Sequence, residues 1–201
     1  MVDDAVRHGS SASNLNLPNA ITVARILLAP VFLWLLFADA GEGGTLRWAA
    51  TALFILAIAT DGIDGYIARS RNIVTDLGKL LDPIADKVLT GAALVALSIL
   101  DESPWWITIV ILVREIGITV HRMVVMSSHV VAAAWMGKLK TVVQAVAISF
   151  ALAPFAPLVG DWILVVNGVL MAAALVLTVA SGVDYVAAEA RGARAARRSR
   201  S

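Results

Sequence analysis

The sequence DGIDGYIARSRNIVTDLGKLLDPIADK occupies residues 61–87 and joins two strongly apolar segments, 46–60 and 88–100. Four of its aspartates lie at the facing ends of these segments: Asp61, Asp64, Asp82 and Asp86. Ionisable side chains at a membrane boundary are costly, and they are kept mainly where they line a wet cavity, bind a cation or take part in chemistry. We therefore expect this stretch to form the active site, with the rest of the chain as its support.

The composition indicates an integral membrane protein. Of the 201 residues, 59% are hydrophobic and only 15% are charged, and the mean hydropathy is +0.83. Soluble domains are closer to about half apolar and a quarter charged, so a soluble domain of this length could not bury so much apolar surface. The absence of cysteine excludes disulfides and thiolate ligands, and restricts any metal site to oxygen or imidazole ligands.

Six apolar segments account for most of the chain. Each is close to the roughly 20 residues that a helix needs to cross the hydrocarbon, although the fifth is short unless residues 135–138 begin it. The predicted segments are 20–38, 46–68, 80–100, 105–126, 140–153 and 162–186. Backbone groups cannot stay unpaired in lipid, and these runs lack the alternation of barrel strands, so the predicted fold is an all-α membrane bundle.

The chain divides into a polar N-terminal segment (1–16), a six-helix membrane domain (17–188) and a basic tail (189–201), which we expect to be disordered. Lys and Arg gather on one side: Arg7, Arg69, Arg71, Lys79, Arg122, Lys138, Lys140 and five arginines of the tail. The other side carries Arg47 alone with several acids, and tryptophans suited to a membrane interface. By the positive-inside rule, both termini and the acidic stretch face the cytoplasm, where the polar, metal-containing cavity would open.

Helical spacing groups the acidic stretch into two stripes, because positions three and four apart share a helix face. One stripe lies on the second segment and the other on the third: Asp61, Asp64, Gly65 and Ala68; Gly78, Asp82 and Asp86. The connection 70–77 is short enough to make these helices antiparallel neighbours. Four carboxylates this close would repel one another unless cations lay between them.

Hard oxygen ligands select Mg²⁺, Mn²⁺ or Ca²⁺, and a pair of such ions can clamp the attacking and leaving oxygens in phosphoryl chemistry. The small residues Gly65, Ala68 and Gly78 would leave room for a phosphorylated ligand to approach the backbone. Arg69, just beyond the stripe, would neutralise a diphosphate.

The pattern DxxDGxxAR, eight residues and then GxxxDxxxD resembles the signature of the CDP-alcohol phosphotransferases, and the chain fills all eight fixed positions. The likeness extends over LPNAITVARILLAP, LLDPIADKVL, VREIGITVHR and GKLKTVVQ, which are similar to family members that join sn-glycerol 3-phosphate to CDP-diacylglycerol and release CMP.

The resemblance implies that Asp61, Asp64 and Asp82 ligate two divalent ions, Mg²⁺ or Mn²⁺. Asp86 would complete the metal cluster and act as general base on the acceptor hydroxyl. It implies further that a set of residues holds the CDP-lipid: Gly65, Ala68, Arg69 and Gly78, with Thr22 and Arg25 as further candidates. Arg25 has an alternative interpretation, because a long side chain near a helix end can extend to the membrane surface. The family also suggests a homodimer.

Four cations approach the same side from the fourth and fifth segments: Arg114, Arg122, Lys138 and Lys140. Arg114 and Arg122 are eight residues apart and hence on one face, and we expect them to bind the phosphate of a soluble acceptor. For Lys138 and Lys140 an equal alternative is that they are ordinary positive charges flanking a membrane helix. This alternative poorly explains Arg114, which lies deep in its helix.

Three other functions stay open at this stage. Relatives use other acceptors, namely phosphatidylglycerol in cardiolipin synthases of this type, inositol phosphate or serine. A cation-coupled transporter would need its site near the midplane rather than at one boundary. A catalytically silent assembly partner would have no need of the complete signature.

Overall fold

The computed structural model describes residues 17–70, 76–124 and 134–198, and all the secondary structure in these ranges is helical. Side chains are described there except at 17–19, 61–70, 76–83, 86, 122, 124, 134 and 193–198. The elements are α1 (Leu17–Ala38), α2 (Thr45–Ser70), α3 (Asp76–Ile99), α4 (Trp105–Val124), α5 (Ala134–Leu152), α6 (Ala156–Val159) and α7 (Trp162–Arg198). For the described chain, the predicted all-helical fold is confirmed.

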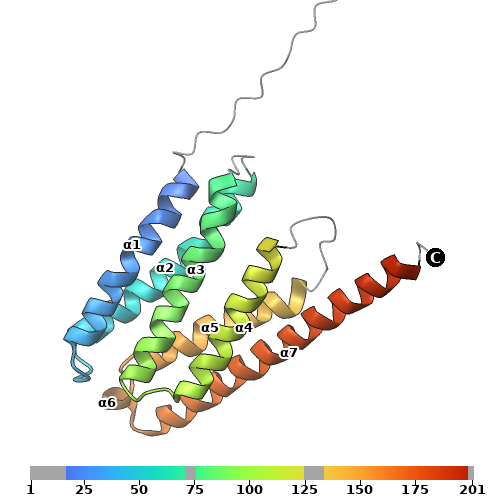
Figure 1. Cartoon of the computed structure of the whole chain (residues 1–201). Helices are drawn as coiled ribbons and strands as arrows, with labels where there is room; N and C mark the ends of the chain where they lie inside the picture. The colour runs from blue at the N-terminus through green and yellow to red at the C-terminus, as the bar shows by residue number, and fades with distance from the viewer. Residues whose placement is uncertain (1–16, 71–75, 125–133, 199–201) are drawn as a thin grey trace, which may run out of the picture.

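The long helices alternate in direction, so that the chain forms an up-and-down bundle (Figure 1). The starts of α1, α3 and α5 gather at one end of the bundle with the ends of α2, α4 and α7. We call this the signature end, because α2 and α3 bring residues 61–70 and 76–86 to it. The turns between α1 and α2, between α3 and α4, and around the short α6 lie at the opposite end.

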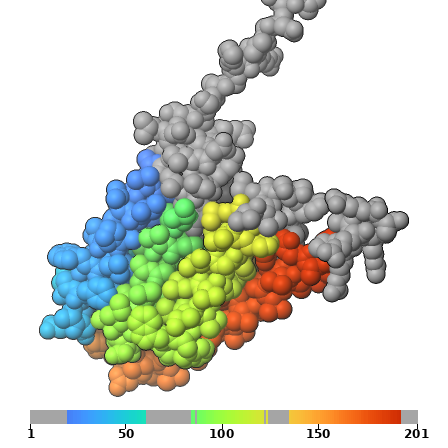
Figure 2. All heavy atoms as spheres, in the orientation of Figure 1, coloured from blue at the N-terminus to red at the C-terminus, as the bar shows by residue number. Residues whose placement is uncertain are grey.

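The core lies where α1 packs against both α2 and α3. Phe32 of α1 and Phe54 of α2 are fully buried, with ring centroids 5.7 Å apart. Alanines on α2 and α3 let the backbones approach closely, as is common between membrane helices: Ala50, Ala57, Ala93 and Ala96. On one face of the molecule α1, α3, α4 and α7 succeed one another from edge to edge (Figure 2), while α5 packs against α2, α3 and α7.

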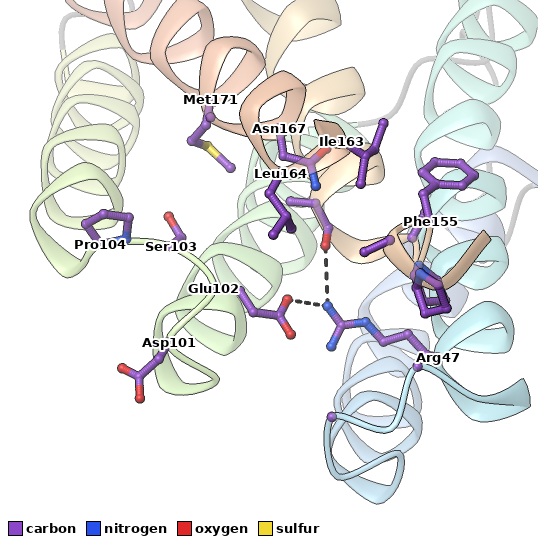
Figure 3. A pocket seen from close by; sticks show the side chains of 18 of the residues that line it. Arg47, Asp101, Glu102, Ser103, Pro104, Phe155, Ile163, Leu164, Asn167 and Met171 are labelled. Carbon is purple, nitrogen blue, oxygen red and sulfur yellow. Dashed lines mark hydrogen bonds and ion pairs between the residues drawn. The ribbon is translucent and has the colours of Figure 1, made fainter. Parts of the chain in front are cut away.

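A buried polar network closes the opposite end of the bundle (Figure 3). The Asp39 carboxylate accepts hydrogen bonds from the backbone N–H groups of Gly43 (2.8 Å), Gly44 (2.9 Å) and Arg47 (3.2 Å), where α2 begins. The Arg47 guanidinium donates to the carbonyl of Leu152 at 2.7 Å and pairs with Glu102. Arg47 therefore ties α2 to the end of α5 and to the α3–α4 turn, beside a cavity of about 660 Å³.

The outer surface of the described helices is consistent with a membrane protein. Among the described residues, Ala20–Ala38 and Trp162–Gly192 are long and apolar enough to cross a membrane, consistent with a membrane protein. Exposed aliphatic side chains cover both spans, and the exposed tryptophans Trp48, Trp105, Trp106 and Trp162 lie at or near the ends of helices at the opposite end of the bundle. Aromatic side chains of this kind are typical of the membrane–water interface.

Helix boundaries differ from the predicted segments mainly at polar ends. The third and fifth helices begin earlier than predicted, at Asp76 and Ala134, so the fifth helix includes residues 135–138. The prediction of a disordered tail is wrong for most of its length, because α7 continues to Arg198. Alanine, arginine and glutamate are good helix formers, and a helix that is already nucleated extends without a new nucleation cost. The 37 residues of α7 span roughly 55 Å at 1.5 Å per residue, well beyond the hydrocarbon.

Candidate active site

The helices bring the predicted signature to one end of the bundle. Five of its positions lie in the last turns of α2, namely Asp61, Asp64, Gly65, Ala68 and Arg69. Gly78, Asp82 and Asp86 lie in the first half of α3, which runs in the opposite direction (Figure 1). The side chains of all eight residues lie outside the described part of the chain, so their positions around metal ions stay a prediction.

The donor set on these two helices fits hard divalent cations. The spacing between Asp61 and Asp64 is three residues and between Asp82 and Asp86 four, and each pair lies in continuous helix. Each pair therefore shares a helix face. Carboxylate oxygens are the ligands that Mg²⁺ and Mn²⁺ prefer.

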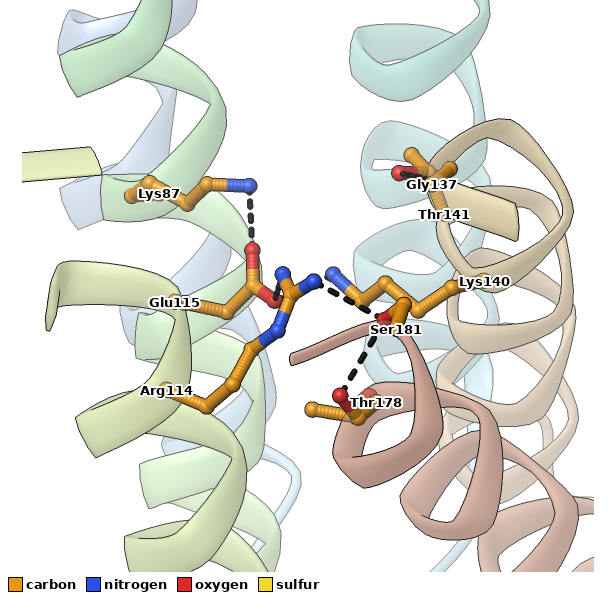
Figure 4. Close-up of polar contacts among 8 residues, drawn as sticks. All are labelled: Lys87, Arg114, Glu115, Gly137, Lys140, Thr141, Thr178 and Ser181. Carbon is orange, nitrogen blue, oxygen red and sulfur yellow. Dashed lines mark hydrogen bonds and ion pairs between the residues drawn. The ribbon is translucent and has the colours of Figure 1, made fainter. Parts of the chain in front are cut away.

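Next to this set, one buried carboxylate collects cations from three helices (Figure 4). Glu115 of α4 is 4% exposed. Its Oε2 is 2.6 Å from Nζ of Lys87 on α3, and its Oε1 is 2.9 Å from Nη1 of Arg114 and also accepts a hydrogen bond from Lys140 of α5. We call Lys87, Arg114, Glu115 and Lys140 the Glu115 cluster. Counted over these four described residues alone, three cations and one carboxylate give the cluster a formal charge of +2.

Arg114 has a second anchor on α7. Its Nη2 donates to the Ser181 hydroxyl at 2.8 Å, and Ser181 donates in turn to the Thr178 carbonyl at 3.1 Å. The neighbouring Gly182 leaves room for the arginine stem, because a Cβ there would lie 3.3 Å from Cγ of Arg114. The guanidinium is thus held between α4 and α7 and points toward Glu115 (Figure 4).

The four predicted acceptor-binding residues do not behave alike. Arg114 and Lys140 meet in the Glu115 cluster, whereas Lys138 is exposed on another side of α5. Positions two apart on a helix do not share a face, so the two lysines separate. Membrane flanking is the wrong interpretation for Lys140, which is 2% exposed. The side chain of Arg122 lies outside the described residues.

Thr22 and Arg25 of α1 are both buried. Arg25 is 2% exposed, and its Nε donates to the carbonyl of Ala57 at 3.0 Å. Ala57 precedes Asp61 by one helical turn. The alternative in which Arg25 extends to the membrane surface is therefore wrong; the residue ties α1 to α2 one turn before the signature.

Sequence reasoning did not assign a role to Lys87, Glu115 or Ser181. A signal for Glu115 was present, because it is an acid well inside an apolar helix, and such a group needs a buried cationic partner. Lys87 directly follows Asp86 but lies outside the signature's fixed positions. Lys87 and Glu115 both line a groove of about 280 Å³ between α3 and α4, with Val88, Leu112 and Ile116 among its walls.

Comparison with known proteins agrees with these features. A family profile described as CDP-alcohol phosphatidyltransferase matches residues 15–180. A probable phosphatidylglycerophosphate synthase of Mycobacterium tuberculosis is 48% identical over 173 residues, which cover 86% of this chain and 80% of that protein. Proteins named CDP-diacylglycerol--glycerol-3-phosphate 3-phosphatidyltransferase are 44% identical in Bacillus subtilis and 38% in Rickettsia typhi. These matches cover 67% of this chain in both cases, and 75% and 74% of those proteins. The profile covers most of the chain, which therefore belongs to the CDP-alcohol phosphatidyltransferase family.

Proposed function

We propose that this protein transfers the phosphatidyl group of CDP-diacylglycerol to sn-glycerol 3-phosphate, giving phosphatidylglycerophosphate and CMP. Family membership supports the reaction class, and the relatives' names support this donor and acceptor. The proposal includes six membrane-spanning helices, α1 to α5 and α7, with both termini and the signature end facing the cytoplasm. It also includes a homodimer as the working form.

The charge of the Glu115 cluster is the observation that supports a phosphorylated, water-soluble acceptor, and the relatives' names favour glycerol 3-phosphate over inositol phosphate. A phosphate monoester bears nearly two negative charges near neutral pH, which match the two excess positive charges of the cluster. Burial strengthens this attraction, because the local dielectric is far below that of water. Serine and the singly charged phosphatidylglycerol match the formal charge of the cluster less well.

In the proposed reaction, the acceptor hydroxyl attacks the phosphorus that bears the diacylglycerol. A new P–O bond forms, the diphosphate P–O bond to the cytidine side breaks, and CMP leaves with the bonding electrons. Asp86 takes the proton of the attacking hydroxyl, a role that a carboxylate within hydrogen-bond reach can fill. Lys87 directly follows Asp86 on α3 and contacts Glu115, so the acceptor's phosphate would be held near the base.

The remaining signature residues would hold the donor. Asp61, Asp64, Asp82 and Asp86 would bind two Mg²⁺ or Mn²⁺ ions. When bound, these ions would offset the charge of the diphosphate and lower the pKa of the carboxylates around them. The donor's CDP part would contact Gly65, Ala68, Arg69, Gly78, Thr22 and Arg25.

A panel of radiolabelled acceptors tests the proposal. Purified protein with Mg²⁺ and CDP-diacylglycerol should release CMP and form labelled lipid with glycerol 3-phosphate. It should form far less labelled lipid with phosphatidylglycerol, inositol phosphate or serine. A preference for any of these three would replace the proposed acceptor, and a protein that releases no CMP with any acceptor would contradict the enzyme function itself.

A further inference from the structure

We infer that Glu115 is the positioning residue of the acceptor site: it holds Lys87, Arg114 and Lys140 where they bind the acceptor's phosphate, without touching the substrate itself. The inference rests on the proposed function, because it assigns the Glu115 cluster to the phosphate of glycerol 3-phosphate. Its starting point is one buried carboxylate shared by cations from α3, α4 and α5.

Geometry makes Glu115 the common point of the cluster. Its Oε2 contacts Lys87, whereas Oε1 accepts hydrogen bonds from Arg114 and Lys140. Each cation comes from a different helix, so the carboxylate fixes not only three side chains but also the approach of three helices (Figure 4). The exposed Lys138, only two residues from Lys140, shows how differently a lysine of the same helix lies without this contact.

Charge explains why such a group is needed. Three cations gathered in a partly buried space repel one another, and each has lost hydration. Lysine and arginine have long flexible stems that can carry their charges back to water when no anion holds them. Glu115 offsets one of the three charges, so the formal charge of the cluster is opposite and similar in size to that of an arriving dianion. The site is thereby assembled before the substrate binds, and preorganisation of this kind lowers the cost of binding.

The opposite role is also physically possible, and it predicts the reverse effect. A carboxylate beside three cations could compete with the acceptor's phosphate for the same donors. Removal of that carboxylate would then strengthen acceptor binding. The sign of the change in acceptor affinity therefore decides between positioning and competition.

Three variants separate position from charge. E115Q leaves three cations and no carboxylate, and K87M leaves two cations with the carboxylate. The double variant E115Q/K87M leaves two cations and no carboxylate, which restores the excess of two positive charges found in the wild type. CMP release would be measured for each at saturating CDP-diacylglycerol while glycerol 3-phosphate is varied, and then with the two substrates exchanged.

If Glu115 positions the cations, E115Q and the double variant both raise the KM for glycerol 3-phosphate by roughly 10- to 100-fold, the effect of misplacing charge-assisted hydrogen bonds. The KM for CDP-diacylglycerol stays unchanged. The double variant has a higher KM for glycerol 3-phosphate than K87M alone. E115D keeps a carboxylate one methylene shorter and should fall between E115Q and the wild type. An E115Q variant that binds the acceptor more tightly, or a double variant that matches the wild type, would overturn the inference.

E102Q is the matched control, because Glu102 also pairs with a buried arginine but lies at the opposite end of the bundle. Its KM for glycerol 3-phosphate should equal that of the wild type. If E115Q does not accumulate in the membrane, the double variant carries the test, since it keeps the wild-type charge. A wild-type protein inactive with glycerol 3-phosphate would refute the proposed function. An active wild type with an unchanged KM in E115Q would refute only the role of Glu115.

Discussion

Replacing Arg47 by methionine should destabilise the protein without reaching its active site. Arg47 is 4% exposed at the end of the bundle opposite the signature. Its Nε donates to the carbonyl of Leu152, the last residue of α5, and its Nη2 lies 3.3 Å from the carbonyl of Ala151. The last carbonyls of a helix have no partner within it, so the guanidinium caps α5 and complements its dipole. Methionine fills similar space but donates no hydrogen bond.

The size of the loss follows from the groups left behind. The strong bond to Leu152 is charge-assisted and buried, and such a bond with its stranded acceptor amounts to about 3 kcal/mol. Glu102 adds little, because its side chain is 34% exposed and can turn to water. For a chain of this length about 3 kcal/mol corresponds to a fall in Tm of roughly 6–12 °C.

Thermal unfolding in detergent, followed by tryptophan fluorescence, measures this change. E102Q removes the ion pair but keeps both carbonyl bonds, so its Tm should fall by less than half as much. A Tm for R47M within the error of the wild type would refute the capping argument. Equal falls for R47M and E102Q would show that the ion pair, not the capped helix end, stabilises this region.

Two further predictions concern the signature end. D86N should lower the rate of CMP release by roughly 10²- to 10⁴-fold, the usual contribution of a general base. Equilibrium binding of CDP-diacylglycerol should stay largely intact. A D86N variant with the wild-type turnover rate would show that Asp86 is not the general base. G182A places a methyl group 3.3 Å from Cγ and 3.5 Å from Nε of Arg114, so it should raise the KM for glycerol 3-phosphate several-fold. It should not lower the Tm, because alanine is more stable than glycine in a helix interior by up to about 1 kcal/mol. The control G168A lies on the same helix with nothing within 4 Å of the new methyl group, and an equal rise in KM there would contradict the argument from Arg114.

The second half of the chain shows where helical periodicity stops being informative. The spacing of Arg114 and Arg122 predicts a common face, and the sequence GKLKT predicts two cations near a membrane boundary. Neither pattern distinguishes Lys138 from Lys140, because the rotation of α5 in the bundle depends on what packs against it. The structure turns Lys140 inward to Glu115 and leaves Lys138 exposed.

By itself the sequence determined the features that depend on neighbouring residues: an apolar helical chain, the two acidic stripes of the signature and the family to which it belongs. These follow from composition and from a repeat of 3.6 residues, which are local properties. Only the tertiary structure decided that Arg25 ties α1 to α2 and that cations from three helices meet at Glu115. Such contacts join residues up to dozens of positions apart, and their existence depends on how the helices pack, which no local pattern encodes.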